Sequence, residues 1–343
     1  MGLIKKILRK IKNVLVTIPD RMLPKYMYWS RFTSMIYYVF LSRSFYREFQ
    51  SVLAGKVKYL NNIESESKNF YQLIRNTHRI EKGLLMRPRR SVFALDYIKE
   101  TMDCFEKHWK KNYSENTDQL KWSKDVLKMY FEVTKGSHII EAQKKRFTSI
   151  ISENNHILKL KANKSVPYYN KKISNISYDD FYKLCRQRRS TRWFQDKRVP
   201  RDLIDKAILA AVQSPSACNR QPFEYRVIDD EQKVKEIASF PGGTAGYAHN
   251  IPVMLVAVGN LDAYFSERDR HLIYIDASLA NMALMFALET LGLSSCAINW
   301  PDVEAREKKM EEFLNLKKYQ RPIMCMAVGY ADTEGMVAYS EKK

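Results

Sequence analysis

The segment RRSTRWF, residues 188–194, gathers three arginines, two hydroxyl groups and two large aromatic rings. Guanidinium groups grip phosphate through paired, charge-assisted hydrogen bonds, and Ser190 and Thr191 add hydroxyl donors. Taken alone, an arginine-rich helix end is more often only solvated surface. The segment therefore predicts a phosphate site if neighbouring residues complete a ligand pocket.

A second polar segment, SPSACNRQP at residues 214–222, offers such a complement. The side-chain amides of Asn219 and Gln221 carry donors and acceptors, so they can read a flat polar heterocycle. The sequence contains neither G-x-G-x-x-G nor G-x-x-x-x-G-K-[ST], which leaves a Rossmann dinucleotide site and a P-loop without support. Phosphate and a polar ring bound without these motifs would suit a mononucleotide-type cofactor such as FMN.

Helix and strand patterns position both segments. Ser177, with Asp180 three residues on, caps a predicted helix that ends at Arg188 and leads into RRSTRWF. The buried stripe of that helix is predicted to be Phe181, Leu184 and Cys185. Further predicted elements are a helix over 199–215, strands at 223–229, 251–259, 294–299 and 323–330, a nearly all-apolar helix at 274–293, and a charged helix at 301–316.

The order of these motifs resembles the nitroreductase family of FMN-dependent oxidoreductases. That family has an Arg-x-Ser-x-Arg/Lys-x-Phe segment, an apolar helix, a Pro-Ser-x-x-Asn-x-Gln-Pro loop and a strand, and residues 188–228 carry all four in order. LETLGLSSCAINW and MAVGYAD resemble later family segments, although Ser294 replaces a glycine and Ala331 a proline. The likeness covers roughly 178–343, and the chain is similar to a long subgroup that carries EKGL in a helical N-terminal extension.

The resemblance implies an α+β fold, a mostly antiparallel sheet flanked by helices, preceded by a basic all-helical region. It implies that Arg188 and Ser190 hold the FMN phosphate and that Arg192 lies near the pyrimidine edge of the flavin. It also places a last basic residue, Lys342 or Lys343, at the phosphate. The implied cofactor-binding set is Arg188, Arg189, Ser190, Arg192, Pro215, Ser216, Asn219, Gln221, Ser295, Cys296, Ala297 and Lys342.

The implied reaction is ping-pong hydride transfer from NAD(P)H, through FMN bound where two subunits meet, to a nitro, quinone or other conjugated acceptor. The helix at 274–293 would form much of a homodimer interface. No catalytic acid or base and no metal site is implied, and Cys218 and Cys296 are interpreted as small buried fillers. The alternatives are a flavin-dependent dehydrogenase, a flavin-modifying enzyme, and a non-enzymatic basic adaptor at a membrane surface.

Charge is distributed unevenly along the chain. Residues 1–170 hold 33 Lys and Arg against 15 Asp and Glu, whereas residues 171–343 hold 25 against 23. The basic half favours an anionic neighbour, but no zinc finger, RNA-recognition motif or basic zipper is present, which argues against nucleic acid. Five cysteines without C-x-x-C spacing favour a reducing cytoplasmic compartment.

The N-terminal half divides into predicted parts. Residues 1–19 form a cationic amphipathic helix, and residues 1–18 either lie on an anionic membrane surface or pack on the protein itself. Residues 20–170 form a helical region of unassigned role, in which 32–41 is a buried helix or an interfacial anchor and 110–119 a loop. A linker at 165–177 leads to the FMN-binding domain at 171–343.

Three segments stay open between a structural and a functional interpretation. In HRIEKGLLMRPRR, residues 78–90, Gly83 is predicted to break the helix. The arginines of this segment either lie on the basic surface of a helix end or form a basic strip that closes over an anionic ligand. The glycines of 240–250 belong to an ordinary loop or let backbone approach a ligand. The charged run ERDRH, residues 267–271, is solvated surface or lines the substrate entrance.

Overall fold

The computed structural model divides the chain into two compact units, Met1–Val52 and Leu53–Lys343. The helix predicted at 1–19, most of the loop at 110–119, and Lys342 with Lys343 lie outside the described residues. The residues described are 22–64, 69–110, 117–153, 165–169 and 171–340.

The first unit contains short helices whose apolar side chains face outward. α2 (Arg31–Ile36) begins after Ser30, whose hydroxyl accepts a hydrogen bond from the Thr33 amide at 3.1 Å, and continues into the π-helical turn η1 (Tyr37–Ser42). Of the two interpretations of 32–41, the buried helix is wrong, because no residue of α2 or η1 is buried and Phe40 is 69% exposed; the interfacial anchor stays a prediction. Consecutive apolar residues such as YYVFL cover every side of a helical turn, and short neighbouring helices cover only some of them.

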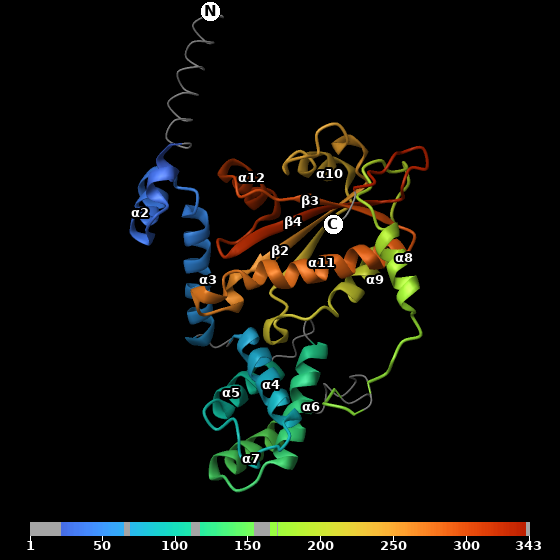
Figure 1. The fold of residues 1–343 in the computed structure, drawn as a ribbon. Helices are drawn as coiled ribbons and strands as arrows, with labels where there is room; N and C mark the ends of the chain where they lie inside the picture. The colour runs from blue at the N-terminus through green and yellow to red at the C-terminus, as the bar shows by residue number, and fades with distance from the viewer. Residues whose placement is uncertain (1–21, 65–68, 111–116, 154–164, 170, 341–343) are drawn as a thin grey trace, which may run out of the picture. The chain divides into compact units, whose positions relative to one another are not determined.

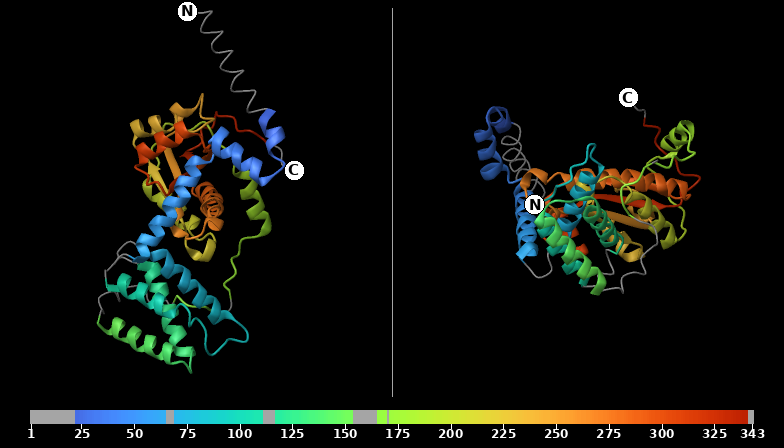
Figure 2. Two further views of the ribbon diagram at one scale, coloured as in Figure 1. Left: turned by 90° about the vertical axis from the view of Figure 1, so that its left-hand side faces the viewer. Right: turned by 90° about the horizontal axis from the view of Figure 1, so that it is seen from below.

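A helical bundle opens the second unit. α3 (Tyr46–Glu64) begins in the first unit and runs into the second, where α4 (Phe70–Leu85), α5 (Ile98–Lys110), α6 (Thr117–Val133) and α7 (His138–Glu153) follow. Figure 2 shows α4 to α7 side by side. Phe105, Trp109 and Tyr130 are fully buried between them. The helical character predicted for this region is confirmed.

Gly83 lies inside α4 and does not end it, so the predicted helix break is wrong. A Cβ atom at Gly83 would lie 2.4 Å from Cε2 of Phe93. The ring of Phe93 packs edge-on against Tyr130, whose hydroxyl donates to the Phe93 carbonyl at 2.7 Å. The glycine is therefore needed for close packing between α4 and the segment before α5, not for a turn.

The sheet of the second unit is antiparallel throughout. Its strands are β1 (Phe223–Ile228), β2 (Val253–Asn260), β3 (Ser294–Asn299) and β4 (Gln320–Gly329), in the order β1-β2-β4-β3. Every residue of β2 is buried, because helices cover both faces. The predicted strands are confirmed within one to three residues at their ends.

Two pairs of helices enclose this sheet (Figure 1). On one face α9 (Arg201–Ala211) and α11 (Leu272–Thr290) pack on Leu255 and Met326. On the other face α10 (Glu231–Ile237) and α12 (Glu304–Leu314) pack on Met254 and Cys325. The predicted fold class, an antiparallel sheet flanked by helices after a helical N-terminal region, is confirmed.

α8 (Tyr178–Gln187) connects the linker to RRSTRWF. Ser177 caps it as predicted, because its hydroxyl accepts from the Asp180 amide at 3.1 Å and donates to the Asp180 carboxylate at 2.7 Å. The predicted buried stripe is wrong, since no residue of α8 is buried and Phe181 is 48% exposed. α8 contacts α11 through the rings of Phe181 and Phe286, whose centroids are 5.6 Å apart.

One helical stretch among the described residues, Glu267–Thr290, has the length and apolar composition of a membrane span. It contains α11, whose Ala280, Leu284 and Leu288 are fully buried in the layer beneath the sheet. A central core helix passes the same test of length and composition, so this stretch is accounted for by the packing of the domain.

Candidate active site

RRSTRWF lies along the edge of the sheet. α8 ends at Gln187 with Arg188 as its C-cap, and the next residues run beside β3, where the Thr191 amide donates to the Ser295 carbonyl at 3.0 Å. The Gln195 amide then donates to the Tyr330 carbonyl at 2.9 Å, beyond the end of β4. These backbone bonds hold Arg188, Ser190 and Arg192 in a fixed order next to β3.

Two buried polar atoms of this region have no hydrogen-bond partner within the described part of the chain. They are Nε of Arg188 and the hydroxyl oxygen of Ser295. Buried polar groups are normally satisfied, so such a pair indicates a missing acceptor, of which a phosphate is one. The charge of Arg188 also acts on Glu289 of α11, whose pKa is raised by burial and lowered again by Gln187 and Arg188.

The side chain of Arg192 contacts Tyr247, an aromatic residue that no sequence motif predicted as part of the site. Its guanidinium carbon lies 6.0 Å from the ring centroid of Tyr247, in the glycine-containing segment 240–250. The Tyr247 hydroxyl is 3.9 Å from the sulfur of Cys296, and burial first, then Cys296, raises the pKa of Tyr247 to about 12. Cys296 itself is buried in the core, as a small filler would be. Neutral Tyr247 thus positions the Arg192 charge.

The loop at 215–221 is held in a strained conformation. It contains the short helix η4 (Ala217–Asn219), and Cys218, Asn219 and Gln221 have φ values of 55°, 54° and 49°. Left-handed backbone at non-glycine residues costs roughly 1 kcal/mol or more each and clusters at functional sites. Asp276 of α11 anchors the loop by accepting from the Ala217 amide at 3.0 Å.

The side chain of Gln221 is used within the fold. Its amide nitrogen donates to the Val212 carbonyl at 2.6 Å, and its amide oxygen accepts from Gln119 of α6 at 3.3 Å. The Gln221 backbone amide donates to the Ser216 hydroxyl at 3.0 Å. No hydrogen bond of the Asn219 side chain is present among the described residues, so Asn219 is the loop residue best placed to read a ligand.

The two predicted segments do not meet within one chain. Gln187 contacts Glu289 at one end of α11, whereas Ala217 contacts Asp276 thirteen residues away, which corresponds to about 20 Å along the helix. The sheet register agrees, because the loop precedes Phe223, paired with Gly259, while Ser295 is paired with Val328 at the opposite end of β2. In Figure 1, α8 lies beside only one end of α11.

The remaining predicted residues divide between these two places. Arg189 is half-buried and donates to the Arg188 carbonyl at 3.0 Å, and Ala297 lies further along β3. Pro215 is exposed and Ser216 half-buried in the strained loop. Lys342 lies outside the described residues.

Comparison with protein families decides what kind of domain this is. The model of the nitroreductase family matches residues 185–241 and 239–330. Residues 185–330 form a nitroreductase-family domain. The resemblance drawn from RRSTRWF and SPSACNRQP is thereby confirmed, and the matched residues begin within α8, after the helical bundle.

Relatives of the nitroreductase domain are diverse. A putative NADH dehydrogenase/NAD(P)H nitroreductase of Methanothermobacter thermautotrophicus is 25% identical over 45% of this chain and 79% of its own length. An FMN reductase [NAD(P)H] of Bacillus subtilis is 26% identical over 41% of this chain and 62% of its own length, so the chain spans less than two thirds of that relative. The solved FMN-dependent nitroreductase of Clostridium difficile R20291 is 24% identical over 45% of this chain and 90% of its own, with a TM-score of 0.40.

Proposed function

We propose that the chain is an FMN-dependent oxidoreductase that uses NAD(P)H to reduce an acceptor. Relatives named NAD(P)H nitroreductase and FMN reductase support this class of reaction. Bound FMN would supply hydride transfer between NAD(P)H and a nitro, quinone or other conjugated compound, in ping-pong order.

The observation that carries the proposal is the pair of buried donors without partners, Arg188 Nε and the Ser295 hydroxyl, beside Ser190. They fit a phosphate group, which offers several strong acceptor oxygens. Arg192, backed by Tyr247, would supply positive charge at the pyrimidine end of the ring, where negative charge develops on reduction. The residues thus fit FMN.

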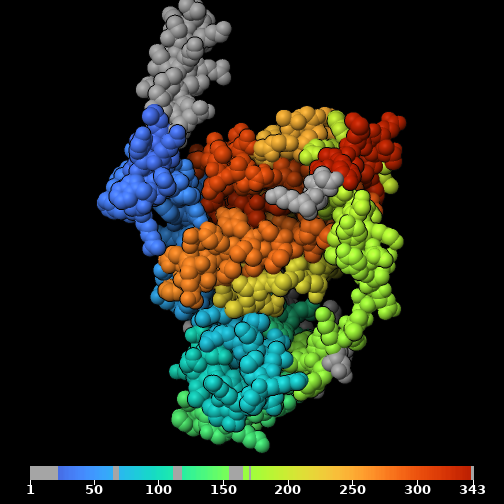
Figure 3. Space-filling model, viewed as in Figure 1, coloured from blue at the N-terminus to red at the C-terminus, as the bar shows by residue number. Residues whose placement is uncertain are grey.

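We also propose that the working form is a homodimer in which each site takes RRSTRWF from one subunit and the loop at 215–221 from the other. The separation of about 20 Å within one chain supports this arrangement. α11 exposes Ile275, Leu279 and Met282, which repeat at helical spacing on one side. Figure 3 shows α11 open on the surface of the domain, and a second copy would cover this apolar stripe.

The experiment is a visible spectrum of the purified full chain, followed by anaerobic addition of NADPH and of NADH. A yellow protein that either nicotinamide bleaches supports the reductase. A yellow protein that neither bleaches favours a flavin-dependent dehydrogenase or flavin-modifying enzyme. A colourless protein that takes up no added FMN would favour an adaptor and overturn the proposal.

Substitution of Arg188 tests the phosphate site directly. Arg188→Ala should weaken FMN binding by about 1.5–3 kcal/mol, the usual contribution of a charged hydrogen bond, or roughly 10- to 150-fold in Kd. The matched control is Arg186→Ala, an exposed arginine in the last turn of α8. Equal FMN affinity of the Arg188 variant and the control in fluorescence titration removes Arg188 from the site.

For localisation, we propose contact with an anionic membrane surface from the cytoplasmic side. Support comes from the basic amphipathic sequence of 1–18 and from exposed aromatic side chains in the first unit, which are favourable at a lipid–water interface: Tyr26, Tyr28, Trp29, Phe32 and Phe40. The full chain should sediment with phosphatidylserine vesicles but not with phosphatidylcholine vesicles. Deletion of residues 1–18 should abolish sedimentation and spare NAD(P)H oxidation; an unfolded deletion variant would show that the segment is structural.

A further inference from the structure

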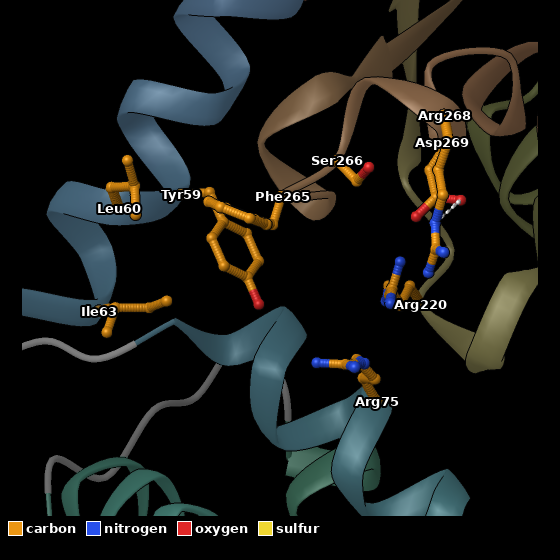
Figure 4. A pocket seen from close by; sticks show the side chains of 9 residues that line it. All are labelled: Tyr59, Leu60, Ile63, Arg75, Arg220, Phe265, Ser266, Arg268 and Asp269. Atoms are coloured by element: carbon orange, nitrogen blue, oxygen red, sulfur yellow. Dashed lines mark ion pairs between the residues drawn. The ribbon is translucent and has the colours of Figure 1, made fainter.

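A cavity of about 340 Å³ lies apart from RRSTRWF, between the helical bundle and the nitroreductase domain. α3 contributes Tyr59 and Ile63, α4 contributes Arg75, the strained loop contributes Arg220, and the run ERDRH contributes Arg268 (Figure 4). The volume falls in the range of about 300–1,000 Å³ that is typical of small-molecule sites. These residues come from four separate elements, and no sequence motif groups them.

The cavity has an excess of positive charge. Three arginines line it against one carboxylate, that of Asp269, which lies 3.8 Å from Nε of Arg268. Within the part of the chain that the structure describes, no carboxylate lies within 4.0 Å of the Arg75 or Arg220 guanidinium. Arg220 interacts electrostatically with Asp276, which also anchors the loop.

The contacts of these arginines orient them without neutralising them. Arg220 lies over the ring of Tyr264 at 4.6 Å, and its Nε is buried without a hydrogen-bond partner in the described residues. Arg75 points toward the Tyr59 hydroxyl, as Figure 4 shows. Burial raises the pKa of Tyr59 above its usual value, while Arg75 and Arg220 lower it again, so the hydroxyl stays neutral and adds no negative charge beside these two arginines.

The opposite wall is apolar. Tyr59 is buried, its ring centroid lies 5.9 Å from that of Phe265, and Ile63 and Leu60 continue the wall along α3. Guanidinium groups beside an aromatic and aliphatic wall are complementary to a molecule with an acidic group on an apolar or aromatic body.

We propose that this cavity binds the electron acceptor, and that the acceptor carries a carboxylate or phosphate held by Arg75, Arg220 and Arg268. Arg220 lies between Asn219 and Gln221, so one short loop joins the cavity to the proposed flavin site. The inference rests on the proposed function. It assigns a role to the helical bundle, which supplies Arg75, and to ERDRH, which supplies Arg268.

The test compares two nitroaromatic probes of similar size and shape, the anionic 4-nitrobenzoate and the neutral 4-nitrobenzamide. With either probe, NADPH supplies two electrons, the nitro group takes them up with two protons, and one oxygen leaves as water to give the nitroso product. Binding to the FMN-loaded full chain is measured by calorimetry without NADPH, and KM and kcat are measured with it. Benzoate and phenyl phosphate, as competitors, distinguish a carboxylate site from a phosphate site.

The variants are Arg75→Gln and Arg268→Gln, with Arg201→Gln on the exposed surface of α9 as the matched control. Arg268 has an 83% exposed side chain, so its substitution is compatible with folding even if Arg75→Gln is not. Wild type should bind 4-nitrobenzoate more tightly than 4-nitrobenzamide. In each variant the affinity for the acid should fall, and KM for the acid should rise, by about tenfold or more, as expected for loss of a charged hydrogen bond, while the values for the amide and kcat stay unchanged.

Each other outcome overturns the proposal. The cavity has no acid-binding role if the wild-type protein binds the acid and the amide equally. The same holds if Arg75→Gln and Arg268→Gln weaken the binding of both probes equally. A rise in KM for NADPH but not for 4-nitrobenzoate assigns the arginines to the nicotinamide cosubstrate instead. A yellow, NADPH-bleached protein with any of these results keeps the proposed function and loses only this inference, whereas a colourless protein loses the proposed function itself.

Discussion

If the active site is shared between two subunits, as proposed, two inactive chains should complement each other. Arg188→Ala should damage RRSTRWF, and Asn219→Gly should remove the loop amide while keeping the left-handed backbone that glycine adopts without strain. If each site combines Arg188 of one subunit with Asn219 of the other, a dimer of one variant with the other contains one doubly damaged site and one intact site. Each variant alone contains none.

The expected magnitude follows from this count. The wild-type dimer should bind about two FMN molecules, the mixed dimer about one, and each single-variant dimer essentially none at an FMN concentration well below the weakened Kd. The assay is co-expression of the two variants with different affinity tags, tandem purification of the mixed dimer, and measurement of FMN per dimer by absorbance after release.

A second dimer makes the result decisive. It pairs a chain carrying both substitutions with a wild-type chain. Sites shared between subunits would then both be damaged, whereas sites formed within one chain would leave the wild-type subunit intact. One FMN in this control and none in the mixed dimer would refute the argument from the length of α11.

Two further predictions concern stability. Gly83→Ala should lower the free energy of unfolding, measured in urea, by about 1–2 kcal/mol. Displacement of the Phe93 ring costs about 1–3 kcal/mol, which outweighs a helix-propensity gain of up to about 1 kcal/mol. In a Phe93→Ala background the same change should stabilise the protein, and equal effects in both backgrounds would exclude the clash. Asp262 is buried, and burial first, then Glu224, raises the pKa of its carboxyl group to about 6, although Lys58 lowers it. The stability that this group contributes is therefore present below about pH 4 and is lost as the pH rises through 6. Asp262→Asn should therefore gain up to about 3 kcal/mol relative to wild type between pH 4 and pH 7.5, and a pH-independent difference between the two proteins would contradict the assignment.

The elements around the site were predictable because their signals are local. The Ser177 cap, the apolar run of β2 and the continuous apolar character of α11 each depend on a few adjacent residues. Errors arose where tertiary contacts decide. Phe181 is apolar at helical spacing but has little to pack against, and Gly83 continues a helix because Phe93 fills the space that a side chain would take.

The motifs predict which residues form the candidate site, but they do not predict the distances between them. Arg188 and Asn219 could be assigned to one ligand from their motifs, but only the length of α11 shows that one chain keeps them apart. Tyr247 escaped notice because a tyrosine among glycines has no distinctive spacing. The arginine-lined cavity could not be found from the sequence, since Arg75 and Arg268 are almost two hundred residues apart.

The position of RRSTRWF has a consequence for solubility. β3 is the last strand of the sheet, and the Thr191 amide occupies the Ser295 carbonyl, which would otherwise be open to a strand from another molecule. The residues proposed to hold a phosphate thus also shield a sheet border against intermolecular pairing. Substitutions between 188 and 194 act on both properties, and self-association of such a variant must be measured before its loss of FMN is attributed to a lost contact.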